Sequence, residues 1–248
     1  MRILVTAGNT QAPIDRVRCL TNIFTGRTGS SIALHAHLLG HDVTLLTSHP
    51  ETVRDRQAET GPLARWSLHT FRTFDDLHRL MTRHVGEGGF DAIIHSAAVS
   101  DYLAASVHRQ AAHTRFQPDG RWTSDTAEPP RLEDCTASKV KSDKPELWIR
   151  LVRAPKLIDR IRSEWGFRGV LVKFKLEVDV SDEDLLEIAE RSRRHSDADL
   201  MVANTLEGAD SWAFLGPVRD RYERVERSAL PASLLDEIER LHEEHRRG

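Results

Sequence analysis

Short apolar runs alternate along this chain with longer segments of helical periodicity. Runs rich in β-branched and aliphatic residues predict buried strands. These predicted strands lie at residues 3–6, 42–47, 91–99, 169–176 and 199–204. The first run stops at Gly8, and a second glycine-containing turn at residues 25–29 precedes the next periodic segment. The pattern therefore predicts a buried strand, two turns and a helix within the first forty residues.

Helical segments separate the predicted strands. The predicted helices cover residues 30–39, a segment after Thr73, a segment from Pro155, residues 182–195 and residues 231–247. Thr73 and Ser181 have the side chains of N-cap residues, and acidic residues follow each of them. Strands that alternate with helices predict an α/β fold, which we expect to be a Rossmann-like, doubly wound and mostly parallel sheet.

Two stretches depart from this alternation. Residues 103–138 are polar and contain several prolines, so we expect an irregular insertion there. Residues 138–141 and 147–152 predict two short strands, which would form a hairpin flap at about residues 138–152. We expect one nucleotide-binding domain that spans residues 1–248 and contains both the insertion and the hairpin flap.

Several candidate binding residues fall where the predicted strands end. Gly8, Asn22, Asp101, Phe174 and Asn204 all fall at or near such ends. Ligands of open α/β sheets bind at the carboxyl ends of the strands. A helix that begins after Gly26 and Gly29 would also present free backbone N–H groups there, where they favour a phosphate or carboxylate.

Composition narrows the class of partner. The chain has 248 residues, of which 39% are hydrophobic and 29% charged, and its formal net charge is −3. This mixed charge predicts neither a nucleic-acid nor a membrane partner, and no apolar run approaches the length of a membrane helix. The two cysteines and thirteen histidines lack the spacing of a metal site, so we expect no protein-bound metal, free thiols and a cytoplasmic location.

Seven short blocks, taken together, resemble one known family. They lie in the family's order at residues 5–10, 22–29, 97–102, 139–141, 155–157, 174–177 and 202–204. In this order they are similar to those of the phosphopantothenate–cysteine ligases, across roughly residues 1–210. The resemblance implies a step of coenzyme A biosynthesis, in which a nucleoside triphosphate activates 4′-phosphopantothenate as an acyl nucleotide. The amine of L-cysteine then displaces the nucleotide.

The resemblance also implies roles for particular residues. The catalytic residues that it implies are Asn22 and Lys139. The nucleotide-binding residues that it implies are His95, Ser96, Ala97, Asp101, Lys139, Pro155, Lys156, Leu157, Ile158 and Phe174. The substrate-binding residues that it implies are Gly8, Arg18, Thr25, Gly26, Gly29 and Asn204. Asn22 is an uncharged donor suited to an oxyanion, and Lys139 is a compact positive charge suited to a triphosphate. Mg²⁺, CTP or ATP, and a homodimer are implied as well.

Several alternatives stay open at this point. Lys141 is a second candidate for the active lysine, because the insertion before it leaves the alignment uncertain. Arg27 and the block at residues 174–177 are more similar to the ATP-using type of the family than to the CTP-using type. The acid substrate is open too, and a non-catalytic nucleotide-binding protein is an alternative. A nicotinamide-dependent oxidoreductase is disfavoured, because no G-x-G-x-x-G follows the first strand.

Overall fold

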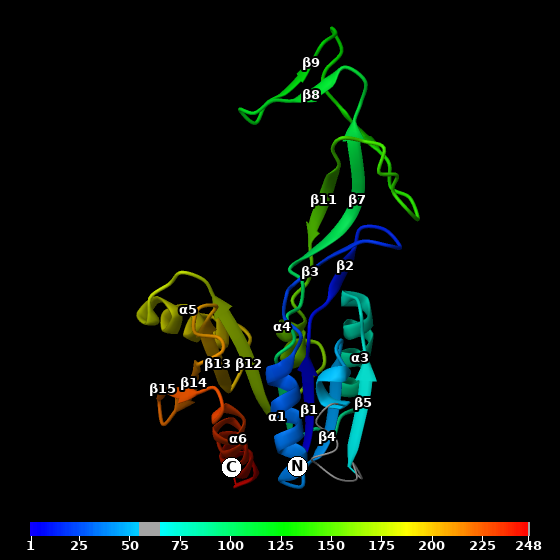
Figure 1. Cartoon of the computed structure of the whole chain (residues 1–248). Coiled ribbons are helices and arrows are strands. Elements are labelled where there is room, and N and C mark those ends of the chain that lie inside the picture. The colour runs from blue at the N-terminus through cyan, green and yellow to red at the C-terminus, as the bar shows by residue number, and fades with distance from the viewer. Residues whose placement is uncertain (55–64, 248) are drawn as a thin grey trace. The chain divides into compact units, whose positions relative to one another are not determined.

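The computed structural model describes residues 1–54 and 65–247, which form two compact units (Figure 1). The sheet unit comprises Met1–Thr10, Ile23–Val99 and Lys156–Gly248. The insertion unit comprises Gln11–Asn22 and Ser100–Pro155. The insertion unit therefore contains residues 11–22 as well as the insertion expected from the sequence. The expectation of a single domain stays a prediction.

The sheet unit is built on one eight-stranded sheet with the order β15-β14-β13-β12-β6-β1-β4-β5. Its strands are β1 (Arg2–Ala7), β4 (Asp42–Thr47), β5 (Trp66–Thr70), β6 (Ala92–His95), β12 (Val170–Glu177), β13 (Leu200–Thr205), β14 (Trp212–Val218) and β15 (Arg221–Glu226). The six strands from β5 to β13 pair in parallel, and β14 and β15 add an antiparallel edge. The predicted mostly parallel α/β sheet is therefore confirmed.

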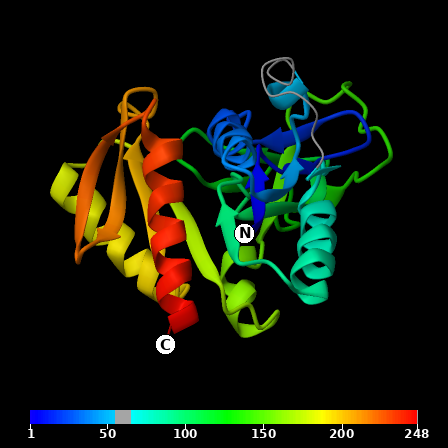
Figure 2. The ribbon, with the colours of Figure 1, turned by 90° about the horizontal axis from the view of Figure 1, so that it is seen from below.

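Helices cover both faces of this sheet (Figure 2). They are α1 (Arg27–Leu38), α3 (Phe74–Glu87), α4 (Leu157–Ser163), α5 (Asp182–His195) and α6 (Leu230–Arg247). On β13, Leu200 and Val202 face the core shared with α1 and α6, whereas Met201 and Ala203 pack against α5. This alternation explains why the strand reads as continuously apolar. No helix in the described residues has the length and apolar content needed to cross a membrane.

The strand order reverses at β1. From β1 the chain passes outward through β4 to β5, and then returns to the other side of β1 with β6 before it continues to β12 and β13. The two connections leave the carboxyl ends of β1 and β6 in opposite directions. In folds of this kind, that reversal opens a crevice in which ligands bind.

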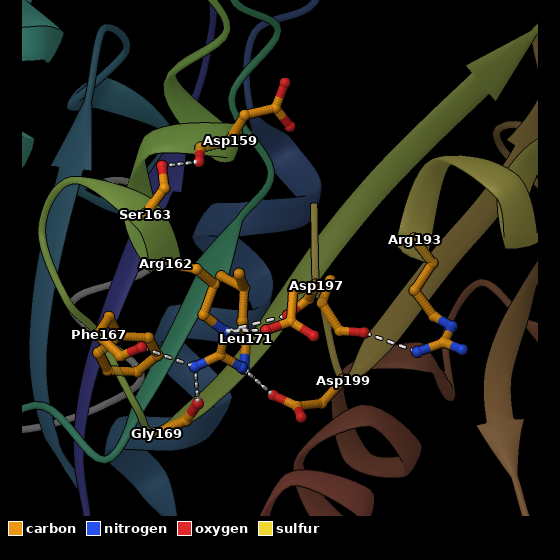
Figure 3. A network of polar contacts seen from close by, with 10 residues as sticks. Asp159, Arg162, Ser163, Phe167, Gly169, Leu171, Arg193, Asp197 and Asp199 are labelled. Atoms are coloured by element: carbon orange, nitrogen blue, oxygen red, sulfur yellow. Dashed lines mark hydrogen bonds and ion pairs between the residues drawn. The ribbon is translucent and has the colours of Figure 1, made fainter. Parts of the chain in front are cut away.

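Arg162 of α4 forms a network of hydrogen bonds at the amino ends of the sheet's strands (Figure 3). Its guanidinium donates to the carbonyl oxygens of Phe167, Gly169 and Asp197 at 2.8–3.0 Å, and it pairs with Asp199 at 2.7 Å. The Asp199 carboxylate also accepts from the backbone N–H of Leu171 at 2.7 Å. This network joins α4 to the amino ends of β12 and β13, where it serves stability.

The insertion unit contains more regular structure than the sequence predicted. Its three-stranded sheet has the order β10-β7-β11, formed by β7 (Tyr102–Gln110), β10 (Leu132–Asp134) and β11 (Trp148–Arg153). Two small hairpins accompany it, β2 (Gln11–Pro13) with β3 (Cys19–Thr21), and β8 (Thr114–Phe116) with β9 (Trp122–Ser124). The expectation of an irregular segment at 103–138 is therefore wrong.

The expected hairpin of residues 138–141 with 147–152 is also wrong. Residues 138–141 form no strand, and β11 pairs instead with β7 in antiparallel register. Aromatic packing favours this pairing, because the rings of Phe116, Trp122 and Trp148 lie 4.7–5.0 Å apart and join the β8–β9 hairpin to β11.

Candidate active site

A cavity of about 470 Å³ lies at the carboxyl edge of the sheet, inside the sheet unit. Its walls come from the ends of β1, β6, β12 and β13, the start of α1 and the residue that follows β15. The lining residues are Gly8, Ile23, Phe24, Thr25, Gly26, Arg27, Thr28, Gly29, Ser96, Ala97, Ala98, Phe174, Lys175, Leu176, Asn204, Ala209, Asp210 and Arg227. The cavity therefore occupies the place where the strand order reverses.

Three glycines allow the start of α1 to approach the end of β1. A Cβ atom on Gly26 would collide with the backbone nitrogen of Gly8, and a Cβ atom on Gly29 would lie 2.8 Å from Cβ of Ala7. Gly8 and Gly26 also have φ angles of +91° and +79°, which favour glycine. Side chains at these positions would push the helix away from the sheet, so glycine is needed to form this wall of the cavity.

The first turn of α1 presents backbone donors to the cavity. Its N-cap is Gly26, which supplies no capping side chain, and the turn contains no acidic residue. Within the described residues, the N–H groups of Arg27, Thr28 and Gly29 have no hydrogen-bond acceptor. Unpaired N–H groups and the positive end of the helix dipole attract an anion. This end of the cavity is therefore suited to a phosphate or a carboxylate.

The segment after β6 is fixed to the end of β1. The Ser96 hydroxyl donates to the Thr6 carbonyl oxygen at 2.6 Å, the Ala97 N–H donates to the Thr6 hydroxyl at 3.2 Å, and the Ala98 N–H donates to the Gly8 carbonyl at 2.8 Å. These bonds hold the main chain of residues 96–98 rigidly along the cavity wall. A rigid main chain is a suitable surface for a nucleotide, which is the role predicted for Ser96 and Ala97.

His95 points away from this wall. Its imidazole is buried, and Nδ1 lies 3.0 Å from the Thr6 hydroxyl. Burial, together with the charge of Lys173, lowers the pKa of His95 to about 4, so the ring is neutral at physiological pH. The side chain does not line the cavity, and a nucleotide-binding role for His95 through its main chain stays a prediction.

Asn204 and Phe174 line the cavity from β13 and β12. Asn204 is 7% exposed, and its carboxamide has no hydrogen-bond partner in the part of the chain that the structure describes. The carboxamide is not among the fully buried polar groups that lack a partner, so it is open to the cavity, where a ligand can supply a hydrogen bond. Phe174 packs partly against the core and partly lines the cavity, so one ring face can contact a bound molecule.

The four residues predicted at the next helix start lie elsewhere. Leu157 and Ile158 are buried in the core of the sheet unit, at 1% and 7% exposure. Lys156 is the exposed N-cap of α4, and Pro155 belongs to the insertion unit. None of them lines the 470 Å³ cavity. Their nucleotide-binding roles stay predictions.

Arg18 holds a loop within the insertion unit. Its guanidinium pairs with Asp15 at 2.6 Å and donates to the carbonyl oxygen of Val140 at 2.7 Å, while Asp15 accepts from the Val140 N–H at 3.0 Å. The Arg18 pairing, with further hydrogen bonds from the backbone, holds the pKa of Asp15 well below its usual range. The predicted role of Arg18 in substrate binding stays a prediction beside this structural one.

Lys139 and Lys141 flank the anchored Val140. Both lysines line a second cavity, of about 300 Å³, that also contacts Arg109, Cys135 and Lys144. The structure therefore leaves either lysine available as the predicted triphosphate ligand. Two further predicted residues lie in the same unit: Asn22 follows β3, and the carbonyl oxygen of Asp101 accepts from the Ala154 N–H at 2.8 Å.

Four charged residues line the larger cavity without having been predicted as site residues, namely Arg27, Lys175, Asp210 and Arg227. Asp210 and Arg227 flank the antiparallel strands β14 and β15, which the hydrophobic pattern did not predict. The sequence around Asp210 and Arg227 contains no motif that marks them as site residues.

Three comparisons relate this chain to known proteins. Residues 1–117 match the family model described as "DFP: DNA/pantothenate metabolism flavoprotein C-terminal domain". A "Coenzyme A biosynthesis bifunctional protein CoaBC" from Thermococcus kodakarensis is 29% identical over 97% of this chain and 51% of its own length. The human "Phosphopantothenate--cysteine ligase" is 24% identical over 86% of this chain and 75% of its own length.

A solved structure agrees over nearly the whole chain. "The Crystal Structure of the DNA/Pantothenate Metabolism Flavoprotein from Streptococcus pneumoniae" superposes with a TM-score of 0.74 and 28% sequence identity, and covers 96% of this chain and 98% of that one. The chain spans about half the length of the bifunctional relatives that it matches. The family resemblance of the sequence blocks is thereby confirmed.

Proposed function

Because this chain is a homologue of CoaBC proteins and of the human phosphopantothenate–cysteine ligase, we propose that it is a ligase that joins 4′-phosphopantothenate to L-cysteine. The carboxylate would attack the α-phosphorus of a nucleoside triphosphate and release pyrophosphate. The amine of cysteine would then attack the acyl carbon, form the amide bond and release the nucleoside monophosphate with a proton.

One observation carries this proposal. The cavity at the reversal of the sheet combines an anion-binding helix start with the unpartnered carboxamide of Asn204. A phosphate at the first turn of α1 and a polar chain along Asn204 match the two chemical features of a phosphorylated pantothenate. The volume of about 470 Å³ lies in the range of small-molecule sites.

The remaining predicted residues complete the proposed chemistry. Asn22 would donate to the acyl oxygen as negative charge develops on it, and Lys139 or Lys141 would neutralise charge on the triphosphate. Ser96, Ala97, Asp101 and Phe174 would contact the nucleotide. The experiment below tests whether the nucleotide is CTP or ATP.

Mg²⁺ enters the proposal as the counter-ion of the triphosphate. In the part of the chain that the structure describes, no group of three or more His, Cys, Asp or Glu side chains is placed to hold a metal ion. We further propose a cytoplasmic location, which suits the two free cysteines, Cys19 and Cys135. A homodimer is proposed from the family resemblance, and light scattering on the purified protein tests it.

Pyrophosphate release tests the activity and its nucleotide together. Purified protein is mixed with 4′-phosphopantothenate, L-cysteine and Mg²⁺, and CTP and ATP are compared. Release that requires the acid substrate supports the proposal and identifies the nucleotide. Release that is equally fast without the acid contradicts the proposal, and so does an absence of release with both triphosphates.

A further inference from the structure

Lys173 is a charged residue buried within the sheet. It is 9% exposed, and its partners in the neighbouring strands are His95 of β6 and Met201 of β13. Side chains alternate along a strand, so Lys173 lies on the sheet face opposite to Phe174 and does not line the 470 Å³ cavity. The proposed ligase chemistry gives this residue no role. A buried ammonium group is costly unless it is paired, so its contacts need an explanation.

Two helices hold the ammonium group of Lys173. Nζ donates to the carbonyl oxygen of Ser192 at 2.9 Å and to the hydroxyl oxygen of Ser196, both at the C-terminal end of α5. The Ser196 hydroxyl in turn donates to Oδ1 of Asp159 in α4 at 2.6 Å. These four residues, Lys173, Ser192, Ser196 and Asp159, form the Lys173 cluster. The cluster joins β12 to both helices and places the negative end of the α5 dipole against the ammonium group.

The place of Lys173 in β12 links this cluster to the cavity. At Lys173 the strand is paired on both sides, with His95 and with Met201. Beyond Lys173, only β13 pairs with β12 in the part of the chain that the structure describes. The next three residues, 174–176, line the cavity. Lys173 is therefore the last residue that is held from both sides before β12 becomes a free wall of the cavity.

The elements packed around Lys173 contribute charges of both signs. The titratable residues are His95 on β6, Lys175 on β12, Lys156 and Asp159 at the start of α4, and His195 on α5, whose Nε2 lies 3.4 Å from the Asp159 carboxylate. Burial, the largest effect, lowers the pKa of Lys173 to about 8; the charge of Asp159 opposes this shift, and the charges of Lys156 and Lys175 add to it. Above pH 8 the folded protein therefore loses this proton, at a pH where an unperturbed lysine keeps its own.

We propose that Lys173 is a positioning residue whose charged ammonium group ties the free wall of β12 to α4 and α5, so that ligand binding in the 470 Å³ cavity requires this charge. The inference goes beyond the proposed ligase function, because it concerns any ligand of the cavity. A methionine of similar volume would fill the same space without a buried charge, so stability alone does not explain a lysine here. Loss of the proton removes the attraction of Nζ for Asp159 and frees the wall to leave its binding geometry.

The first test is Lys173→Met, which removes the ammonium group and keeps a side chain of similar volume. Calorimetry at pH 7.0 measures binding of ATP and CTP with Mg²⁺, and of 4′-phosphopantothenate. Affinity for the ligands that occupy the cavity should fall about 10-fold, because the wall is no longer held in place. The urea midpoint should stay the same or rise, because the substitution removes a buried charge. Unchanged affinity for every ligand that the wild type binds would overturn the inference.

The pH dependence separates a positioning charge from a merely structural side chain. Between pH 7.0 and 9.0 the folded wild type loses the Lys173 proton, while the phosphate groups of the ligands stay largely ionised. Wild-type affinity should therefore fall about 5- to 10-fold over this range, whereas that of Lys173→Met should change by less than about twofold. An equal decline in both proteins would assign the pH dependence to other groups and would contradict the proposal.

Two serines bonded to Asp159 provide a matched pair of variants. Ser196 donates to the Asp159 carboxylate, whereas Ser163 of α4 donates to the Asp159 carbonyl oxygen at 2.7 Å and lies outside the Lys173 cluster (Figure 3). Ser196→Ala interrupts the path from Lys173 to Asp159 and should weaken ligand binding by about 3- to 10-fold. Ser163→Ala should leave binding unchanged. Equal effects of the two variants would show that Asp159 does not act through Ser196.

Hydrogen exchange tests the wall itself, without any ligand. In Lys173→Met the amides of residues 174–177 should exchange about 10-fold faster than in wild type, whereas those of β1 should not change. Faster exchange throughout the sheet would indicate a general loss of stability, and unchanged exchange at residues 174–177 would show that the wall does not depend on Lys173. Either result would overturn the inference.

These measurements also separate the inference from the proposed function. If the wild type releases pyrophosphate and Lys173→Met binds its ligands as the wild type does, the inference fails and the ligase proposal stands. If no pyrophosphate is released, but ligand binding and exchange at residues 174–177 depend on Lys173, the ligase proposal fails and the positioning role stands. No binding of ATP, CTP or 4′-phosphopantothenate by the wild type would overturn both.

Discussion

Gly29 in the first turn of α1 contacts Ser96 so closely that a Cβ atom on Gly29 would collide with the Ser96 hydroxyl oxygen. That hydroxyl cannot rotate away freely, because it donates to the Thr6 carbonyl at 2.6 Å. The contact joins the start of a helix to the segment after β6, and both line the cavity. Close packing of backbone at this point sets the shape of the candidate active site.

Gly29→Ala should therefore destabilise the protein and weaken substrate binding. We expect a loss of about 1–3 kcal/mol in the free energy of unfolding, typical of overpacking a tight site. Urea unfolding measures it. Gly86→Ala is the matched control, because Gly86 is also helical and a Cβ atom there meets nothing within 4 Å. That control should be neutral or slightly stabilising, and equal losses in the two variants would contradict the account.

Arg162→Lys should destabilise the sheet unit without affecting the cavity. A lysine cannot replace the separate bonds from the guanidinium to Phe167, Gly169, Asp197 and Asp199. Loss of a largely buried network of this kind costs about 2–4 kcal/mol. Arg191→Lys on the exposed face of α5 should change the unfolding free energy by less than about 0.5 kcal/mol. A similarly small effect of Arg162→Lys would show that the network contributes little.

His95 should make the protein sensitive to acid. Its pKa is lowered to about 4 in the folded protein, against 6.5 for an unperturbed histidine, so between these values the unfolded chain binds a proton that the folded chain does not. Stability should therefore fall as the pH drops below about 6.5, by about 2 kcal/mol at pH 5. Urea unfolding of wild type and His95→Gln at pH 7.5 and 5.0 isolates this contribution, because the carboxylates are common to both. Equal losses in both proteins would be inconsistent with a neutral, buried His95.

Lys139→Gln and Lys141→Gln form a pair in which each variant controls for the other, since both lysines line the same cavity of the insertion unit. The family resemblance favours Lys139. Lys139→Gln should lower kcat for pyrophosphate release by about 100-fold, as loss of a transition-state contact does, and Lys141→Gln by less than about threefold. The opposite order would transfer the role to Lys141, and two small effects would exclude both.

The sheet unit was largely predictable because its signals are local. The helix over residues 182–195 was predicted with the bounds that α5 has, since Ser181 and three acidic residues mark its start. Residues 42–47 were predicted as the strand β4 in the same way, from a short apolar run after Gly40. The resemblance implied Gly8, Gly26 and Gly29 as substrate-binding residues, and all three line the cavity, where the close approach of the backbone requires glycine.

The strands that were missed depend on distant partners. In β7 only Val107 is buried, so no apolar run marks this strand. Its partner β11 was predicted as a strand at residues 147–152, but the expected partner was residues 138–141, because β7 lies some forty residues earlier in the chain. Strand β14 contains Pro217, a residue that argues against a strand, and its register with β15 shifts between Leu215 and Val218. Arg227 lies beyond these unpredicted strands, which explains why the sequence did not identify it.

The mass of the reaction product tests the central claim most directly. Wild-type protein with 4′-phosphopantothenate, L-cysteine, Mg²⁺ and either CTP or ATP should form a product one water lighter than the two substrates together. Nucleoside monophosphate and pyrophosphate should appear in equal amounts with it. Absence of this product with both triphosphates, from protein that still binds 4′-phosphopantothenate, would contradict the proposed ligase activity.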